Sequence, residues 1–142
     1  MALDASPSAL NAQGELLTDE DRTRADVYRL LSRILGAPAE RAVLDVLSRL
    51  IGDTSPLGLT IDRLAAAARG SSPEHAADEY QRLFIGLGRG ILVPYGSYYL
   101  TGFMHEKPLA RLRADMAVLG IERDPTIREP EDHIAIVCET MA

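Results

Sequence analysis

The sequence predicts an all-α fold, a compact helical bundle of about six or seven helices. Apolar residues recur at helical spacing in one segment after another, and turns rich in Gly, Ser and Pro separate these segments. No segment alternates as a strand would, although Gly90 to Val93 is briefly β-like. With 142 residues, 46% of them hydrophobic and 25% charged, the chain is long enough for one domain with a core.

The first helix is expected to begin after Thr18 and to end at Gly36. Thr18 and Asp21 have the spacing of a capping arrangement, and acidic residues favour the first turn of a helix. The residues before it are small and polar. We therefore expect a flexible N-terminal arm over 1–17 and a helical domain over 18–142.

Two further helices follow in the sequence. One is expected to begin near Pro38 and to stop at Gly52, because proline suits the first turn of a helix and glycine its end. Residues 53–58 have the composition of a turn, so Thr60 is expected to cap the next helix, which ends around Gly70.

The fourth helix is expected to start with Ser72 as its cap and Pro73 in its first turn. A short fifth helix carries the aromatic residues from Tyr95 to Phe103 and is capped by Ser97 or begins just before it. Two more helices are predicted from Pro108 to Gly120 and from Pro130 onward. The apolar pattern is still running at Ala142, which predicts a chain truncated at its C-terminus.

Charge and composition narrow the function classes. The net charge of -6 and the pI near 5.0 argue against nucleic acid as a partner and suit a basic peptide. The single cysteine, Cys138, excludes an internal disulfide, and the three histidines are too scattered to predict a metal site. We find neither a secretory signal nor a membrane-spanning helix, so we expect a cytoplasmic protein with no membrane insertion.

The stretch from Glu79 to Met104 holds six of the seven aromatic residues. It is therefore the centre of the core or the lining of a site. Its first part has core spacing, i, i+3 and i+4, and could serve either purpose. Three tyrosines of its second part cannot all point inward from one short helix, so at least one should be exposed: Tyr95, Tyr98 and Tyr99.

Two blocks of this sequence match a family pattern. The first is E-Y-x-x-L-F at Glu79 to Phe84, followed by P-Y-x-S-x-Y at Pro94 to Tyr99. The second is E-P-E-D-H at Glu129 to His133, preceded by P-L-x-x-L-R at Pro108 to Arg113. In these motifs the chain resembles the TorD-like family of cytoplasmic chaperones for molybdoenzyme maturation, specifically from about Glu79 to Met141.

The resemblance implies an all-helical, non-enzymatic protein that binds the N-terminal leader, often a twin-arginine leader, of an apo molybdenum redox enzyme. Family residues implicated in leader binding correspond here to Tyr80, Leu83, Phe84, Pro94, Tyr95, Tyr99, Asp132 and His133. The family continues with further helices after the E-P-E-D-H helix, and this chain lacks them. From the resemblance we therefore expect either a truncated chain or one that completes itself as a homodimer by helix exchange.

The second block also has a chemical interpretation. Glu129, Asp132 and His133 are spaced to share one face across a helix start, where acidic groups also favour the helix dipole. Asp132 could pair with a leader arginine in a bidentate contact. With Tyr98 and Glu129 added to the family positions, the predicted peptide-binding set is Tyr80, Leu83, Phe84, Pro94, Tyr95, Tyr98, Tyr99, Glu129, Asp132 and His133. We expect no cofactor, no metal and no catalytic residue.

An alternative function rests on the glycines Gly86, Gly88 and Gly90, which suggest a guanine-nucleotide-binding regulatory protein. The series lacks the lysine and the preceding strand of a phosphate-binding loop. A bend in the chain is the simpler interpretation.

Overall fold

The computed structural model describes residues 16–86 and 90–142, and this part of the chain is all-α, as predicted. The seven α-helices and one π-helical turn in it are α1 (Asp19–Gly36), α2 (Arg41–Ser48), α3 (Pro56–Arg69), α4 (Pro73–Tyr80), η1 (Gln81–Ile85), α5 (Gly96–Thr101), α6 (Lys107–Val118) and α7 (Ile134–Thr140). The turn η1 continues directly from α4.

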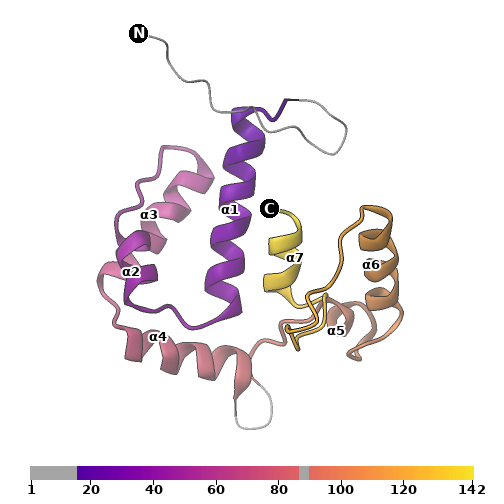
Figure 1. The fold of residues 1–142 in the computed structure, drawn as a ribbon. Coiled ribbons are helices and arrows are strands. Elements are labelled where there is room, and N and C mark those ends of the chain that lie inside the picture. The colour runs from indigo at the N-terminus through magenta and orange to yellow at the C-terminus, as the bar shows by residue number, and fades with distance from the viewer. Residues whose placement is uncertain (1–15, 87–89) are drawn as a thin grey trace.

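Helix α1 runs through the middle of the molecule and separates two groups of helices (Figure 1). Helices α2 and α3 pack together on one side of it, and α7 lies along the other side, with α5 and α6 beyond it. Leu44, Leu47 and Ala68 form a buried cluster between α2 and α3, and Leu30 and Ile34 of α1 pack against it. Helix α4 crosses below α1 and leads the chain from one group to the other (Figure 1).

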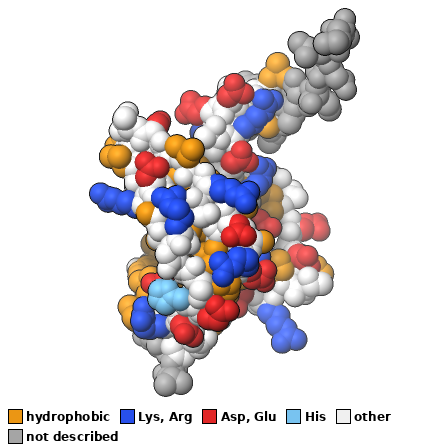
Figure 2. Space-filling model, turned by 90° about the vertical axis from the view of Figure 1, so that its left-hand side faces the viewer, with side chains coloured by type: hydrophobic (Ala, Val, Ile, Leu, Met, Phe, Trp, Pro, Cys, Tyr) orange, Lys and Arg blue, Asp and Glu red, His pale blue; other side chains and the backbone are white. Residues whose placement is uncertain are grey.

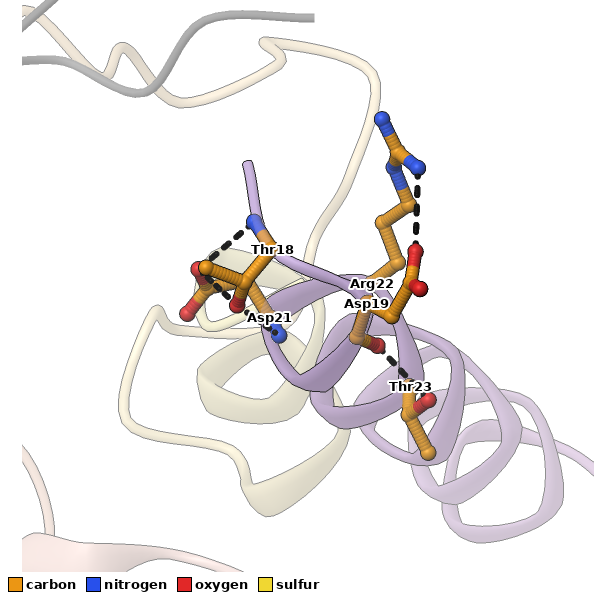
Figure 3. A network of polar contacts seen from close by, with 5 residues as sticks. All are labelled: Thr18, Asp19, Asp21, Arg22 and Thr23. Atoms are coloured by element: carbon orange, nitrogen blue, oxygen red, sulfur yellow. Dashed lines mark hydrogen bonds and ion pairs between the residues drawn. The ribbon is translucent and has the colours of Figure 1, made fainter. Parts of the chain in front are cut away.

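Two of the helix starts that agree with the sequence have a side-chain cap. Thr18 and Asp21 form a reciprocal capping box, in which each side chain accepts a hydrogen bond from the other residue's main-chain N–H (Figure 3). Ser72 caps α4, and Pro73 occupies its first turn. Local side-chain chemistry was enough to predict these two starts.

Other helix starts differ from the prediction. Pro38 precedes α2, which begins only at Arg41. Thr60 lies inside α3, because the Ser55 side chain accepts a hydrogen bond from Gly58 N–H and so starts the helix at Pro56. The predicted turn over 53–58 therefore already contains the first residues of α3.

The largest difference concerns the E-P-E-D-H block, which is not a helix start at Pro130. Helix α7 begins at Ile134 with His133 as its cap. Ile134 N–H donates to the Pro94 carbonyl at 2.8 Å, and Gly96 N–H donates to the Asp132 carbonyl at 3.0 Å. We call these two hydrogen bonds the α5–α7 clamp. They flank an isolated antiparallel bridge between Tyr95 and His133.

No helix in the described part of the chain is both long enough and apolar enough to cross a bilayer. Helix α1, with 18 residues, carries acidic and basic side chains along its length.

Candidate functional site

An apolar pocket of about 410 Å³ lies where η1, the segment 92–96, α5 and the start of α7 meet. Among the described side chains that line it, Asp132 alone carries a charge. The lining residues are Leu35, Phe84, Leu92, Val93, Pro94, Tyr95, Gly96, Tyr99, Asp132, Ile134 and Val137. Half of the predicted set, namely Phe84, Pro94, Tyr95, Tyr99 and Asp132, is brought together here by segments far apart in the sequence.

Tyr80 and Leu83 instead line a second cavity of about 560 Å³, between α4 and the group of α1, α2 and α3. Phe84 lines both cavities. The rings of Tyr80 and Phe84 lie 4.9 Å apart, and the Tyr80 hydroxyl donates to the Leu35 carbonyl at 3.2 Å. Phe84 is therefore shared by the two cavities, whereas Tyr80 and Leu83 line only the larger one.

Glu129 and His133 line a smaller pocket of about 260 Å³ between the end of α1 and α7. Tyr98 lines none of these three pockets and contacts the Tyr99 ring edge-on, with 5.5 Å between ring centroids. Tyr99 is 65% exposed, as expected for at least one tyrosine of this helix. The predicted set thus surrounds one junction of the fold without sharing one cavity.

Tyr95 lines the apolar pocket and also contacts Glu129 and His133. Its hydroxyl donates to Glu129 Oε2 at 2.6 Å, and its ring meets the His133 ring edge-on at 5.2 Å. Burial and the hydrogen bond to Glu129 raise the pKa of Tyr95. The pKa of Tyr80 is raised by burial and then by the charge of Glu129. Both phenols therefore stay protonated as hydrogen-bond donors near a carboxylate.

Asp132 is buried, with 5% of its surface exposed. Its Oδ2 accepts the main-chain N–H of Ser97 in the first turn of α5 at 2.9 Å. That N–H is one of the donors that a helix leaves without an internal partner, and Tyr95, at the N-cap position, supplies no side-chain cap. Oδ1 is the one buried side-chain polar atom of the described residues that has no hydrogen-bond partner. Asp132 thus holds α5 in place with one oxygen and leaves the other unpaired.

His133 is also buried, with 7% of its surface exposed. Its Nδ1 accepts the Ala135 N–H at 3.2 Å and caps α7. Burial lowers the pKa of His133, and the negative charges of Glu129 and Asp132 only partly offset that effect. The ring is therefore a neutral acceptor toward the helix.

An ion pair that the sequence did not predict anchors this block to α6. Glu131 is buried, and its Oε2 accepts hydrogen bonds from Arg113 Nε at 3.0 Å and Nη2 at 2.7 Å. The hydrogen bonds from Arg113 lower the pKa of Glu131. The two partners lie 18 residues apart in the sequence, so no local pattern indicates the pair.

The glycine series falls partly outside the described residues, since Gly88 lies in the gap at 87–89. Gly86 has a φ of 64°, and a Cβ on Gly90 would lie 2.5 Å from the Leu83 carbonyl oxygen. Beside it, Leu92 N–H donates to that carbonyl at 2.7 Å. Both described glycines therefore let the chain turn back on η1, which supports the interpretation as a bend. Nucleotide binding stays a prediction.

On the face turned to the viewer in Figure 2, acidic and basic side chains alternate without a large basic patch. A pocket of about 350 Å³ is lined by Arg123 and by five acidic residues: Glu122, Asp124, Glu129, Glu131 and Glu139. Glu129 therefore contacts Tyr95 of the apolar pocket and also lines this acidic pocket. The described residues include no cluster of three or more His, Cys, Asp or Glu that could hold a metal ion.

Comparisons with known proteins agree with this fold. The family model described as nitrate reductase delta subunit matches residues 52–142, more than half of the chain. A curated relative, the chaperone protein TorD of Vibrio parahaemolyticus, is 27% identical over 93 residues, covering 61% of this chain and 43% of the relative. TorD of Aliivibrio fischeri is 27% identical over 136 residues, covering 84% of this chain and 63% of the relative.

A crystal structure described as a redox enzyme maturation protein from Archaeoglobus fulgidus has the same fold. Its TM-score is 0.62 at 23% sequence identity, and the match covers 83% of this chain and 68% of that one. The chain spans less than two thirds of the length of either curated relative.

Proposed function

Because this chain belongs to the TorD-like family, whose model is described as nitrate reductase delta subunit, we propose that it is a cytoplasmic chaperone for a molybdenum redox enzyme. It binds the N-terminal leader peptide of the apo enzyme while the cofactor is inserted. It binds the leader reversibly and forms no covalent bond with it. The curated relatives are named as chaperones, which supports the prediction that the chain is not an enzyme.

One observation carries this proposal. Phe84, residues 92–96, Tyr99 and Asp132 line an apolar pocket, and a pocket lined by five carboxylates adjoins it through the Tyr95–Glu129 contact. A leader peptide has an apolar section, which suits the first pocket. A twin-arginine leader also has two guanidinium groups, which suit the carboxylates. The tyrosines add apolar faces with hydroxyl groups for main-chain contacts.

The test is a calorimetric titration of the 142-residue chain with a synthetic twin-arginine leader peptide and with a version in which both arginines are lysines. We expect saturable binding of the first peptide and weaker binding of the second, because lysine cannot make the planar contacts of a guanidinium. Glu129→Gln should weaken binding of the arginine peptide. Glu20→Gln, an exposed change in the first turn of α1, should not. Absence of saturable binding by the unaltered chain would refute the proposal.

The homodimer by helix exchange stays a prediction. A solution mass of twice 15.4 kDa for the intact chain would support it, and a mass of one chain would contradict it.

A further inference from the structure

His133 takes part in two contacts at the junction of α5 and α7. Its main chain forms the bridge with Tyr95, and its ring meets the Tyr95 ring edge-on at 5.2 Å. Its Nδ1 accepts the Ala135 N–H at 3.2 Å and so caps α7. One buried side chain therefore contributes both to the contact between the two segments and to the start of a helix.

The hydrogen bond from Ala135 requires an unprotonated Nδ1. A neutral imidazole with its proton on Nε2 has this acceptor, whereas an imidazolium carries a proton on both nitrogens and can only donate. Protonation therefore turns Nδ1 from an acceptor into a donor that faces another donor. The Ala135 N–H then loses its partner, and α7 loses its side-chain cap.

The charged and titratable groups near the ring come from four parts of the fold. They are Arg33 of α1, Tyr95 before α5, Glu129 and Asp132 of the E-P-E-D-H block, and Glu139 of α7. Arg33 and Glu139 are exposed, so solvent screens their charges. Glu129 and Asp132 favour a protonated ring, but burial outweighs them and lowers the pKa of His133. The ring therefore takes up a proton more readily once it is open to water.

The α5–α7 clamp extends the effect of the cap to α5. Both of its hydrogen bonds lie next to His133, at Asp132 and Ile134. Asp132 also caps α5 by accepting the Ser97 N–H, and Asp132 and Ile134 both line the apolar pocket. A movement of residues 132–134 therefore withdraws hydrogen-bond partners from the start of α5 and removes part of the pocket lining.

We propose that His133 is a pH-sensitive latch. Proton uptake at its Nδ1 releases the start of α7, and through the α5–α7 clamp it opens the start of α5 and the apolar pocket, while α2 and α3 stay folded. The trigger is a proton, so the latch works without a ligand and does not depend on the proposed function.

The experiment measures amide hydrogen exchange by NMR from pH 8 to pH 5, with rates corrected for the intrinsic pH dependence of exchange. Ala135 and Ser97 report on the latch, and Leu44 and Leu47, which are buried in α2, report on the other group of helices. We expect the protection factors of Ala135 and Ser97 to fall by up to about tenfold per pH unit below about pH 6.5, the ordinary pKa of histidine. At pH 5 they should be lower than those of Leu44 and Leu47.

Two variants separate His133 from the other titrating groups. His133→Asn keeps a capping acceptor and takes up no proton, so the protection of Ala135 should no longer change with pH. His75→Asn replaces an exposed histidine of α4 and should behave like the unaltered chain. A pH dependence of the same size in His133→Asn would overturn the inference, and so would pH-independent protection of Ala135 in the unaltered chain.

A measurement on the unaltered chain decides the matter if His133→Asn does not fold. The nitrogen chemical shifts of the His133 ring report which nitrogen carries the proton, and we expect the tautomer protonated on Nε2 at pH 8. A ring protonated on Nδ1 at that pH would overturn the inference, because Nδ1 could not then cap α7. Equal protection of Ala135 and Leu44 at pH 5 would also overturn it, because the opening would then involve the whole fold.

Discussion

Asp132 Oδ2 accepts the main-chain N–H of Ser97 at 2.9 Å, across 35 residues of sequence. Asp132, in the E-P-E-D-H block, therefore caps α5, whose own N-cap residue makes no side-chain hydrogen bond. Ser97 is itself fully buried, and its hydroxyl accepts the His105 N–H at 3.2 Å. This pair of residues therefore connects the start of α5 to the E-P-E-D-H block and to the segment that follows the helix.

The first prediction concerns the stability of that arrangement. Asp132→Ala should lower the free energy of unfolding by about 1.5–3 kcal/mol, because it removes a hydrogen bond to a charged acceptor and leaves a buried N–H without a partner. Asp132→Asn should cost less, since its amide oxygen can still accept from Ser97. Urea denaturation followed by circular dichroism measures both. Equal losses would show that the cap does not stabilise α5.

The second prediction concerns the ion pair between Arg113 and Glu131. Arg113→Ala leaves a buried carboxylate without its partner, and we expect a loss of about 1–3 kcal/mol at pH 7. Arg111→Ala, an exposed change on the same helix, should have little effect. Urea titrations of the three proteins provide the comparison.

The stabilisation that the Arg113–Glu131 ion pair provides should decrease as the pH falls. The folded pKa of Glu131 lies below its unfolded value, so its contribution is complete above the unfolded pKa and is lost as the pH falls through the folded pKa. The stability difference between the unaltered chain and Arg113→Ala should therefore shrink in acid below the usual glutamate range. A constant difference down to strongly acid pH would contradict this account.

The third prediction concerns His133. Burial lowers its folded pKa below the ordinary value, so the unfolded chain takes up the proton first as the pH falls. Stability is complete above the unfolded pKa of about 6.5 and declines as the pH falls through the folded pKa. Unfolding free energies measured from pH 8 to pH 5 should show this decline.

A matched pair of variants isolates that titration. His133→Asn keeps an acceptor for the start of α7, because asparagine is a good cap, and should flatten the pH dependence. His75→Asn replaces an exposed histidine in the first turn of α4 and should leave the pH dependence as it was. The same slope in both variants would assign the pH dependence to other groups.

The fourth prediction concerns the glycine bend. A Cβ on Gly90 would lie 2.5 Å from the main-chain atoms of Leu83 and Phe84, which cannot move without shifting η1. Gly90→Ala should therefore destabilise the fold by about 1–3 kcal/mol. Gly70→Ala meets nothing nearer than 3.8 Å and should change stability by less than about 0.5 kcal/mol. Thermal unfolding distinguishes the two, and equal midpoints would contradict the close approach.

The sequence predicted helices wherever local chemistry decides their starts. Thr18 and Ser72 bond main-chain N–H groups three residues away, so their spacing alone indicates a cap. Pro38 and Pro130 were misleading because proline tolerates the first turn of a helix without requiring one. At Ser55 the cap was overlooked in favour of Thr60, whose hydroxyl instead bonds the carbonyl four residues before it.

The sequence selected part of the lining of one pocket and none of its geometry, and a peptide-binding role for these residues stays a prediction. Aromatic clustering and the two motifs selected Phe84, Tyr95, Tyr99 and Asp132, which do line one pocket. The exchange of main-chain hydrogen bonds between residues 94–96 and 132–134 depends on tertiary contact, so no local pattern indicates it. For the same reason the roles of Asp132 toward Ser97 and of Arg113 toward Glu131 were not predicted.

The α5–α7 clamp has a consequence for local unfolding. Gly96 is the first residue of α5, and Ile134 is the first residue of α7. The N–H of each donates a hydrogen bond to a carbonyl in the segment just before the other helix. Fraying of either helix start therefore removes a partner from the other, so the two starts should open as one cooperative unit. The amide protons of Gly96 and Ile134 should exchange with solvent at the same free energy of opening, and the pocket between them should be assembled or lost as a whole.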